Sequence, residues 1–308
     1  MKVLLTGAQG QVGCCLLASA PPGVTTVALG RAALDIGDGE AVHRALAAHR
    51  PDVIINAAAY TAVDRAETEV DAARRVNGQG PRNLALAARD CGARLVHIST
   101  DFVFDGRSGT PYAPDAPTAP LGVYGLTKLE GERAVRALLP EASVVLRTAW
   151  VYAAHGTNFL HTMLRVMRQT GQARVVADQV GTPTAADSLA AVLWALAERP
   201  DIRGVQHFTD AGVASWYDFA VAIAEEAAAR GQLPPGVRVT AIATEDYPTA
   251  ARRPGYSVLD KRALLAALPM EPRHWRVSLR RVLDLISAAP SPYNDGQMPS
   301  NTPVCPSC

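Results

Sequence analysis

The chain of 308 residues is short of cysteine, of aromatic residues and of net charge. Five cysteines in a chain of this length do not make a disulfide scaffold, so we expect reduced thiols. Lysine and arginine number 30 against 29 acidic residues, which leaves a formal charge of +1 and no bulk attraction for nucleic acid or a membrane surface. The sequence has no run of about 20 apolar residues and no apolar core of an export signal. These absences predict a cytoplasmic protein without nucleic-acid or membrane partners.

The composition supplies enough apolar material for a large core. Hydrophobic residues make up 48% of the chain and charged residues 19%, and the length suggests two lobes or one large α/β unit. From Ala288 onward Pro, Ser, Asn and Gly dominate, so we expect residues 288–308 to form a disordered tail. Cys305 and Cys308 form a Cys-x-x-Cys pair there, but the nearby sequence has no His or further Cys to complete a zinc site. We therefore predict no metal.

The first half of the chain alternates strand and helix patterns. The apolar runs of its strands are not interrupted by polar residues, which is typical of parallel strands covered on both faces. This order predicts a Rossmann-type, doubly wound parallel α/β sheet over residues 1–150. The expected strands are 2–6, 25–29, 53–56, 94–99 and 143–147, and the expected helices are 12–20, 40–49, 70–91 and 124–139.

After Trp150 the pattern is looser and predicts a smaller second lobe of mixed α/β structure. We expect this substrate-binding lobe over residues 151–287, with segments up to about residue 185 partly rejoining the first lobe. Its expected elements are helices 158–170, 187–198 and 216–230 and a strand at 174–177.

Three glycines follow the first expected strand and open the first expected helix. Gly7, Gly10 and Gly13 have the spacing G-x-x-G-x-x-G. Glycine suits a tight turn, the close approach of a pyrophosphate to the backbone, and close packing of helix on sheet. Backbone N–H groups around Gln11 and Val12 would hold the phosphates. The position between strand and helix predicts a dinucleotide site; the alternative is a turn with incidental glycines.

The end of the second expected strand bears on the choice of dinucleotide. A carboxylate there accepts the ribose hydroxyls of NAD, whereas an arginine suits the 2′-phosphate of NADP. The chain has Leu29-Gly30-Arg31 at this point and no acid. We therefore predict NADPH, with NADH as an alternative, and place Arg31 at the 2′-phosphate; otherwise it is an ordinary surface charge. Asp35 is expected at the adenine edge, and Ile36 beside it is assigned to the cofactor site.

Tyr124 and Lys128 form a Tyr-x-x-x-Lys pair at the start of an expected helix. Their offset of four residues puts both side chains on one face. A tyrosine has a pKa of about 10, and we expect the Lys128 ammonium, helped by an oxidised nicotinamide ring, to lower it. The phenol then serves as a proton donor to a carbonyl oxygen. Ser99 and Thr100 end the fourth expected strand, where a hydroxyl can hydrogen-bond the substrate oxygen.

Each of these elements alone is weak evidence, because Tyr-x-x-x-Lys occurs by chance in many helices. Their conjunction with the glycine loop, in this chain order, resembles the extended short-chain dehydrogenase/reductase superfamily, which has a C-terminal substrate lobe. Further stretches resemble the dTDP-4-dehydrorhamnose reductase family and together run from residue 1 to about 285. They are GAQGQVG (7–13), NAAAYTAVDRAE (56–67), STDFVFDG (99–106), RTAWVY (147–152), DQVGTPT (178–184) and RPGYSVLD (253–260).

The resemblance implies an activity. It is the NADPH-dependent reduction of the C4 keto group of a dTDP-4-keto-6-deoxyhexose, foremost dTDP-4-dehydro-L-rhamnose to dTDP-L-rhamnose. The resemblance implies that Tyr124 donates the proton, that Lys128 binds the nicotinamide ribose, and that Thr100 hydrogen-bonds the 4-keto group. It also implies substrate contacts for Asp101 and Trp150, although Trp150 has the alternative of a core aromatic.

The resemblance further implies which residues surround the two phosphate-bearing ligands. The dinucleotide pyrophosphate is expected at Gly10, Gln11 and Val12, and the rest of the cofactor at Ala59, Tyr60 and Thr61 after the third strand. Arg253 is expected at the diphosphate of the sugar nucleotide, which a bidentate guanidinium suits. Its alternative is a surface arginine.

The chain departs from the family at its first helix. Some members dimerise through Mg²⁺-binding acidic residues that begin there, whereas this helix opens with Cys14-Cys15 and carries no acid. We therefore expect a monomer or a homodimer without a bridging metal. The alternative functions are a reductase of a related dTDP-4-keto sugar in secondary metabolism, a non-catalytic nucleotide-binding regulator, and an epimerase. Tyr124, Lys128 and Thr100 argue against the regulator, and Arg31 argues against the NAD-dependent epimerase.

Overall fold

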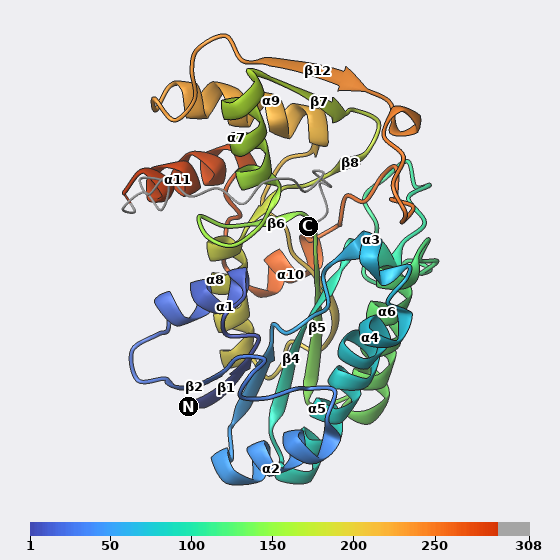
Figure 1. Cartoon of the computed structure of the whole chain (residues 1–308). Coiled ribbons are helices and arrows are strands. Elements are labelled where there is room, and N and C mark those ends of the chain that lie inside the picture. Colours follow the sequence, from blue (N-terminus) through green and yellow to red (C-terminus); the bar gives the residue numbers. More distant parts are fainter. Residues whose placement is uncertain (289–308) are drawn as a thin grey trace.

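The structure is a computed structural model that describes residues 1–288. Its main sheet has six parallel strands in the order β10-β5-β4-β3-β1-β2, with helices on both faces (Figure 1). This arrangement confirms the expected Rossmann-type, doubly wound α/β sheet. The strands are β1 Lys2–Thr6, β2 Thr25–Leu29, β3 Val53–Asn56, β4 Arg94–Thr100, β5 Ser143–Thr148 and β10 Gly204–His207.

Both faces of the sheet are buried, each under its own helices. Val3 and Leu5 of β1 belong to a buried cluster with residues of α1 (Gln11–Ala18) and α8 (Ala186–Glu198). Leu4 points to the opposite face, because successive strand residues alternate. It belongs to a cluster with residues of three other helices: α2 (Gly39–His49), α5 (Gly80–Cys91) and α6 (Val123–Leu138). Burial on both faces is the reason why these strands are continuously apolar.

Local signals explain where several helices begin and end. The Asp38 carboxylate accepts a hydrogen bond from the Ala41 amide (3.1 Å) and so begins α2, and Gly92 ends α5 in the left-handed conformation. The helix expected over 70–91 consists of α4 (Val70–Arg74), a π-helical turn η1 (Arg75–Gln79) and α5. Pro81 has no N–H for the regular helical bond at this point.

The second lobe is built on its own pair of parallel strands, β7 (Gln172–Val176) and β12 (Arg238–Ile242). Its core includes Phe159, Phe219 and Trp275, which come from three different helices. These helices are α7 Phe159–Thr170, α9 Trp216–Ala228 and α11 Trp275–Ala288. The shorter elements are α3 Val63–Ala66, η2 Asp101–Val103, β6 Val151–Tyr152, β8 Val180–Gly181, β9 Thr184–Ala185, β11 Ala214–Ser215, η3 Thr244–Asp246 and α10 Arg262–Ala267.

Two elements beyond residue 185 return to the first lobe. Strand β10 pairs with β5 at the edge of the main sheet, and α8 packs on α1, where Trp194 Nε1 donates to the Leu16 carbonyl oxygen (3.2 Å). The first lobe therefore takes in more of the chain than the sequence predicts. The physical reason is that the pairing of β10 with β5 is a long-range contact, which leaves no mark on the local pattern.

The end of the described chain also differs from the expectation. Ala288, the first residue of the expected tail, is the last residue of α11. The rest of that tail, with Cys305 and Cys308, lies outside the described residues. Within residues 1–288 the cysteines are free thiols. No helix in the same range combines the length and the apolarity needed to cross a membrane.

Candidate active site

The polar ends of the parallel strands meet at one edge of the main sheet, because all six strands run in the same direction. Thr6 ends β1, and its hydroxyl donates to Asn56 Oδ1 at the end of β3 (2.7 Å). Thr100 ends β4 and is paired in register with Thr148 of β5. This edge is where open α/β sheets bind their ligands.

The glycine loop after β1 has the shape that a dinucleotide pyrophosphate needs. Gly7 has φ +68°, and a Cβ there would lie 2.6 Å from the backbone of Ala57. A Cβ on Gly13 would lie 2.3 Å from the Gly7 carbonyl oxygen. No side chain of residues 1–288 caps the start of α1 at Gly10, so the amides of its first turn are available to an anion. The loop therefore fits the phosphates of a nicotinamide dinucleotide.

The residues expected near the adenosine half of the cofactor lie in different environments. Arg31 is exposed. The Asp35 carboxylate accepts hydrogen bonds from the Gly37 amide (2.9 Å) and from Arg75 (2.7 Å). Ile36 is buried in the core, where its side chain packs closely against Gly80. Arg75 thus places a guanidinium at Asp35, which the sequence did not predict because Arg75 lies 40 residues further along the chain.

The loop after β3, with Ala59, Tyr60 and Thr61, is fixed by a residue that no sequence pattern singles out. Asn77 of η1 accepts from the Tyr60 amide (2.9 Å) and donates to the Tyr60 carbonyl oxygen (3.0 Å). The Tyr60 hydroxyl donates to Glu69 (2.6 Å). Asn77 is fully buried, so the π-helical turn that carries it holds the backbone of this loop from inside the protein.

Tyr124 and Lys128 lie in the first turns of α6, as expected. The Lys128 ammonium is buried and donates to the Ile98 carbonyl oxygen (2.7 Å). Burial lowers the pKa of Lys128 to about 8, and the neighbouring Glu132 opposes this shift. The Phe102 ring packs edge-on against the Tyr124 ring, with 5.5 Å between centroids.

The protonation of Tyr124 differs from the expectation. Burial raises the pKa of the Tyr124 phenol to about 12; interaction with the Thr100 hydroxyl lowers it and the charge of Asp101 raises it further. The expected lowering of the Tyr124 pKa by Lys128 is therefore not seen in the protein alone, because desolvation dominates. The phenol stays protonated near neutral pH, which is the state that a proton donor requires.

Asp101 lies directly after Thr100 and is almost fully buried. Its carboxylate accepts from the Thr100 hydroxyl (3.0 Å). Burial raises the pKa of Asp101 to about 6, against the lowering effect of the Ser257 and Thr100 hydroxyls. Tyr124, Thr100 and Asp101 thus form one connected group at the end of β4.

A buried ion pair supports this group from within the first lobe. Arg147 of β5 donates to both oxygens of Glu132 on α6 (2.9 and 2.7 Å), and both side chains are at most 2% exposed. Glu132 also accepts from the Ser99 hydroxyl (2.5 Å). The pair therefore ties α6 to the two strands beside it, one turn beyond Lys128.

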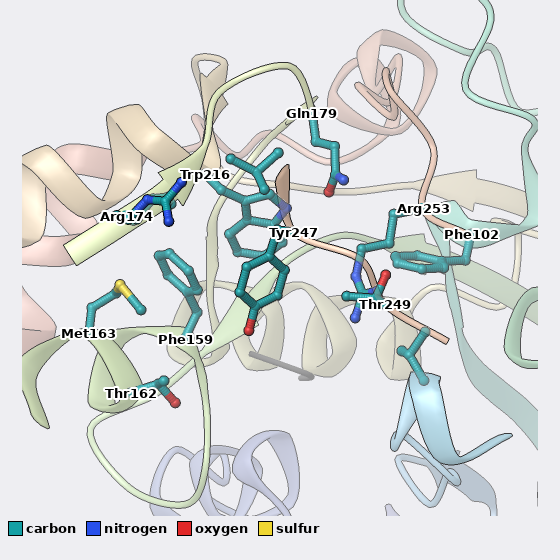
Figure 2. Close-up of a pocket in the computed structure, with 13 residues that line it drawn as sticks. Phe102, Phe159, Thr162, Met163, Arg174, Gln179, Trp216, Tyr247, Thr249 and Arg253 are labelled. Carbon is teal, nitrogen blue, oxygen red and sulfur yellow. The ribbon is translucent and has the colours of Figure 1, made fainter. Parts of the chain in front are cut away.

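A cavity of about 800 Å³, counted with its opening to solvent, lies between the second lobe and the edge of the sheet (Figure 2). Its walls are mostly apolar, and Arg174, Gln179 and Arg253 are among the polar residues. The remaining lining residues are Val63, Phe102, Phe159, Thr162, Met163, Val175, Val176, Trp216, Tyr247 and Thr249.

Of the four residues expected to contact the substrate, one lines this cavity and three do not. Arg253 lines it, whereas Trp150, Thr100 and Asp101 are not among its lining residues. Trp150 has φ +49° and stacks flat on Trp216, a wall residue, with 3.5 Å between ring centroids. Phe102, which follows Asp101 and packs on Tyr124, brings the group at the end of β4 to the cavity wall.

The short helix α3 follows the Ala59–Thr61 loop. This helix and the residue after it contact Arg253 of the cavity wall and the start of helix α6. The Asp64 carboxylate forms a two-point ion pair with Arg253. Glu67, which directly follows α3, accepts from the Val123 amide (2.8 Å), the first amide of α6. The sequence did not predict a role for either acid, because their partners lie 189 and 56 residues away.

Comparison with known proteins gives the family. The model of the family described as RmlD substrate binding domain matches residues 1–287. The dTDP-4-dehydrorhamnose reductase of Burkholderia thailandensis is 44% identical over 298 residues, which cover 93% of this chain and all of that protein. A probable dTDP-4,6-dihydroxy-2-methyloxan-3-one 4-ketoreductase of Streptomyces antibioticus is 43% identical, over 95% of this chain and 98% of that one.

A solved structure agrees with this result. The dTDP-4-dehydrorhamnose reductase of Bacillus anthracis in complex with NADP superposes with a TM-score of 0.87 at 34% identity. The match covers 92% of this chain and 99% of that one. The chain therefore belongs to the dTDP-4-dehydrorhamnose reductase family, a family of NAD(P)H-dependent oxidoreductases.

Proposed function

We propose that this protein reduces the C4 keto group of a dTDP-4-keto-6-deoxyhexose with NADPH, converting dTDP-4-dehydro-L-rhamnose into dTDP-L-rhamnose. One observation carries the proposal: a phenol held in its protonated state, Tyr124, interacts with Thr100 at the edge of the sheet, beside a glycine loop shaped for a dinucleotide. Tyr124 and Thr100 together would receive the 4-keto oxygen of the substrate.

Residues of this chain would bind the cofactor, orient the substrate and protonate its keto oxygen. The glycine loop would hold the pyrophosphate at the start of α1, and Lys128 would hold the nicotinamide ribose. When bound, NADPH supplies the hydride for C4 of the sugar. Thr100 would orient the keto oxygen by a hydrogen bond, and Tyr124 would donate the proton to that oxygen as negative charge develops on it.

The preference for NADPH rests on Arg31 and on the lack of an acid after β2. The relative from Bacillus anthracis, whose structure contains NADP, supports this choice. NADH is the alternative, because Arg31 is exposed and its guanidinium has no partner among the described residues that would fix it beside a 2′-phosphate.

A dTDP sugar suits the cavity beside the catalytic group. Arg253 offers a guanidinium for the diphosphate, and the apolar and aromatic wall, with Phe159 and Trp216, offers surfaces for a base and a deoxysugar. We therefore assign this cavity to the sugar nucleotide.

A related 4-keto sugar is the second candidate substrate. The Streptomyces antibioticus relative carries the name of such a ketoreductase and is 43% identical. An apolar pocket distinguishes sugars that differ by one methylene or hydroxyl by only about 1–3 kcal/mol, so few changes in the wall would exchange one substrate for the other. A non-catalytic regulator is disfavoured, because Tyr124, Lys128 and Thr100 are all present and brought together.

The test is NADPH consumption with dTDP-4-dehydro-L-rhamnose made in place by the preceding enzymes, with NADH run in parallel. We expect oxidation of NADPH and a product that NMR identifies as dTDP-L-rhamnose. Oxidation only with another dTDP-4-keto sugar would support the second candidate. A protein that binds NADPH but reduces none of these sugars would contradict the proposal.

A further inference from the structure

The segment made of helix α3 and the residue after it, Glu67, carries two carboxylates, Asp64 and Glu67, that the proposed reaction does not use. It lies between the loop expected at the cofactor, 59–61, and the catalytic helix α6. Its first residue, Val63, is buried and lines the cavity. An ion pair between Asp64 on this helix and Arg253 joins α3 to the second half of the chain.

Asp64 holds Arg253 at two points. Arg253 donates through Nη1 to Asp64 Oδ1 (3.1 Å) and through Nη2 to Asp64 Oδ2 (2.8 Å). The Ala251 amide also donates to Asp64 Oδ1 (3.0 Å), and the Ala251 carbonyl oxygen accepts from Arg253 Nη1 (3.1 Å). Both charged side chains are only 12% exposed. The guanidinium is thus fixed by charged and backbone partners in a largely desolvated position.

These contacts occupy one edge of the guanidinium and leave a second edge available to a ligand. A guanidinium has five N–H donors in a rigid plane. Asp64 and Ala251 account for both hydrogens of Nη1 and one of Nη2. Nε and the second hydrogen of Nη2 donate to no residue of the described chain, and they form the side edge of the fork. Arg253 lines the cavity, near Phe102 and Thr249 (Figure 2).

We propose that Asp64 is a positioning residue that fixes Arg253 so that the side edge of its guanidinium receives the diphosphate of the sugar nucleotide. The proposal rests on the proposed function, because it takes the cavity as the sugar-nucleotide site. Asp64 cancels the charge of Arg253 and so adds no net attraction for the diphosphate. It contributes orientation: without it the long arginine side chain would lose rotamer freedom when the ligand binds.

The position of α3 connects the Asp64 carboxylate with the catalytic helix α6. Glu67, one turn after Asp64, binds the first amide of α6, which carries Tyr124. The same short segment therefore holds the residue for the diphosphate and the start of the helix with the proton donor. The separation between these two points decides whether the keto carbon reaches Tyr124 once the diphosphate is bound.

The test compares dTDP with thymidine, which has no diphosphate, as ligands of the full chain in the presence of NADP⁺. Calorimetry gives both dissociation constants for the parent, Asp64→Asn, Arg253→Gln and the double variant. We expect each single variant to weaken dTDP binding about tenfold or more and to leave thymidine binding unchanged. The double variant should bind dTDP no more weakly than Arg253→Gln, because Asp64 acts only through Arg253.

Two matched controls separate the ion pair from general changes of charge. Asp71→Asn changes an exposed aspartate on α4, and Arg252→Gln changes the exposed neighbour of Arg253. Both should bind dTDP like the parent. Arg253→Lys, which keeps the charge but not the planar fork, should also weaken dTDP binding, and it decides the question if Asp64→Asn does not fold.

The outcomes separate this inference from the proposed function. Parental or tighter dTDP binding by Asp64→Asn would overturn the positioning role, as would an equal loss of thymidine affinity or effects of the two variants that simply add. Parental dTDP binding by Arg253→Lys would do the same. A parent protein that binds neither dTDP nor thymidine would instead refute the proposed function and the inference with it.

Discussion

The Lys128 ammonium donates a hydrogen bond to the carbonyl oxygen of Ile98 across 2.7 Å. This bond joins the catalytic helix α6 to strand β4 two residues before Thr100. It places a buried cation beside the end of β4, one turn of α6 after Tyr124. The contact also gives the site a group that titrates near physiological pH, since burial lowers the pKa of Lys128 to about 8.

The pH dependence of the reaction should therefore show an alkaline limb. The ammonium form of Lys128 exists below its pKa, so we expect kcat/KM to be full below about pH 8 and to fall as the pH rises through that value. Tyr124 does not produce this limb, because its pKa is about 12. Lys261 also has a pKa of about 8 but bonds to Thr209 (3.0 Å). In pH–rate profiles the limb should persist in Lys261→Arg, and its absence from the parent profile would contradict the prediction.

Removal of the proton donor should stop the chemistry without loss of the cofactor. For Tyr124→Phe we expect kcat to fall by about 10²- to 10⁴-fold and the dissociation constant of NADPH to change little. Steady-state kinetics and fluorescence titration of NADPH measure the two quantities. Tyr217→Phe on α9 is the matched control and should keep parental kcat. Turnover of Tyr124→Phe within a few-fold of the parent would show that Tyr124 is not the proton donor.

Glu67 should stabilise the start of α6 through the oxygen that accepts from the Val123 amide. Glu67→Ala removes this cap and should lower the free energy of unfolding by about 1 kcal/mol, with a fall in kcat because Tyr124 is in the same turn. Glu67→Gln keeps a carbonyl oxygen at that position and should stay close to the parent in both the free energy of unfolding and kcat. Urea denaturation and kinetics provide the measurements. Equal losses in the two variants would argue for a role of the charge instead.

The buried pair of Glu132 and Arg147 should be far more sensitive than a surface pair. Glu132→Gln leaves the Arg147 guanidinium buried without its counter-charge, and we expect a loss of about 3–5 kcal/mol in the free energy of unfolding. Glu40→Gln breaks an exposed pair with Arg44 on α2 and should cost under about 0.5 kcal/mol. Chemical denaturation of both variants gives the comparison. Similar small losses would show that the buried pair contributes little.

Arg31 should distinguish the two cofactors. Arg31→Ala removes the cation expected at the 2′-phosphate, so we expect the KM for NADPH to rise about tenfold and the KM for NADH to stay the same. Arg44→Ala, an exposed arginine of the same lobe, serves as the control. If both cofactors respond alike, Arg31 does not read the 2′-phosphate, and Arg75 beside Asp35 becomes the next residue to test.

Most of the fold follows from local sequence patterns. The strands at 25–29 and 53–56 have the predicted bounds, because short apolar runs bounded by glycine, proline or acidic residues allow few other structures. The return of β10 to the main sheet does not follow from its sequence. Gly204–His207 is an ordinary short segment, and its place beside β5 is decided by a pairing across about 60 residues.

In the candidate site too, some features follow from the local sequence and others depend on distant contacts. The glycine loop, the Thr100 strand end and the Tyr124–Lys128 pair can be recognised in the sequence alone, because the chemistry of each lies within one turn or one helix. The folded chain is needed to see that Asp64 pairs with Arg253, that Asn77 holds the Tyr60 backbone, and that burial raises the pKa of Tyr124 above that of a free tyrosine. Such contacts and pKa values depend on which distant groups share a desolvated space, and that is known only once the chain has folded.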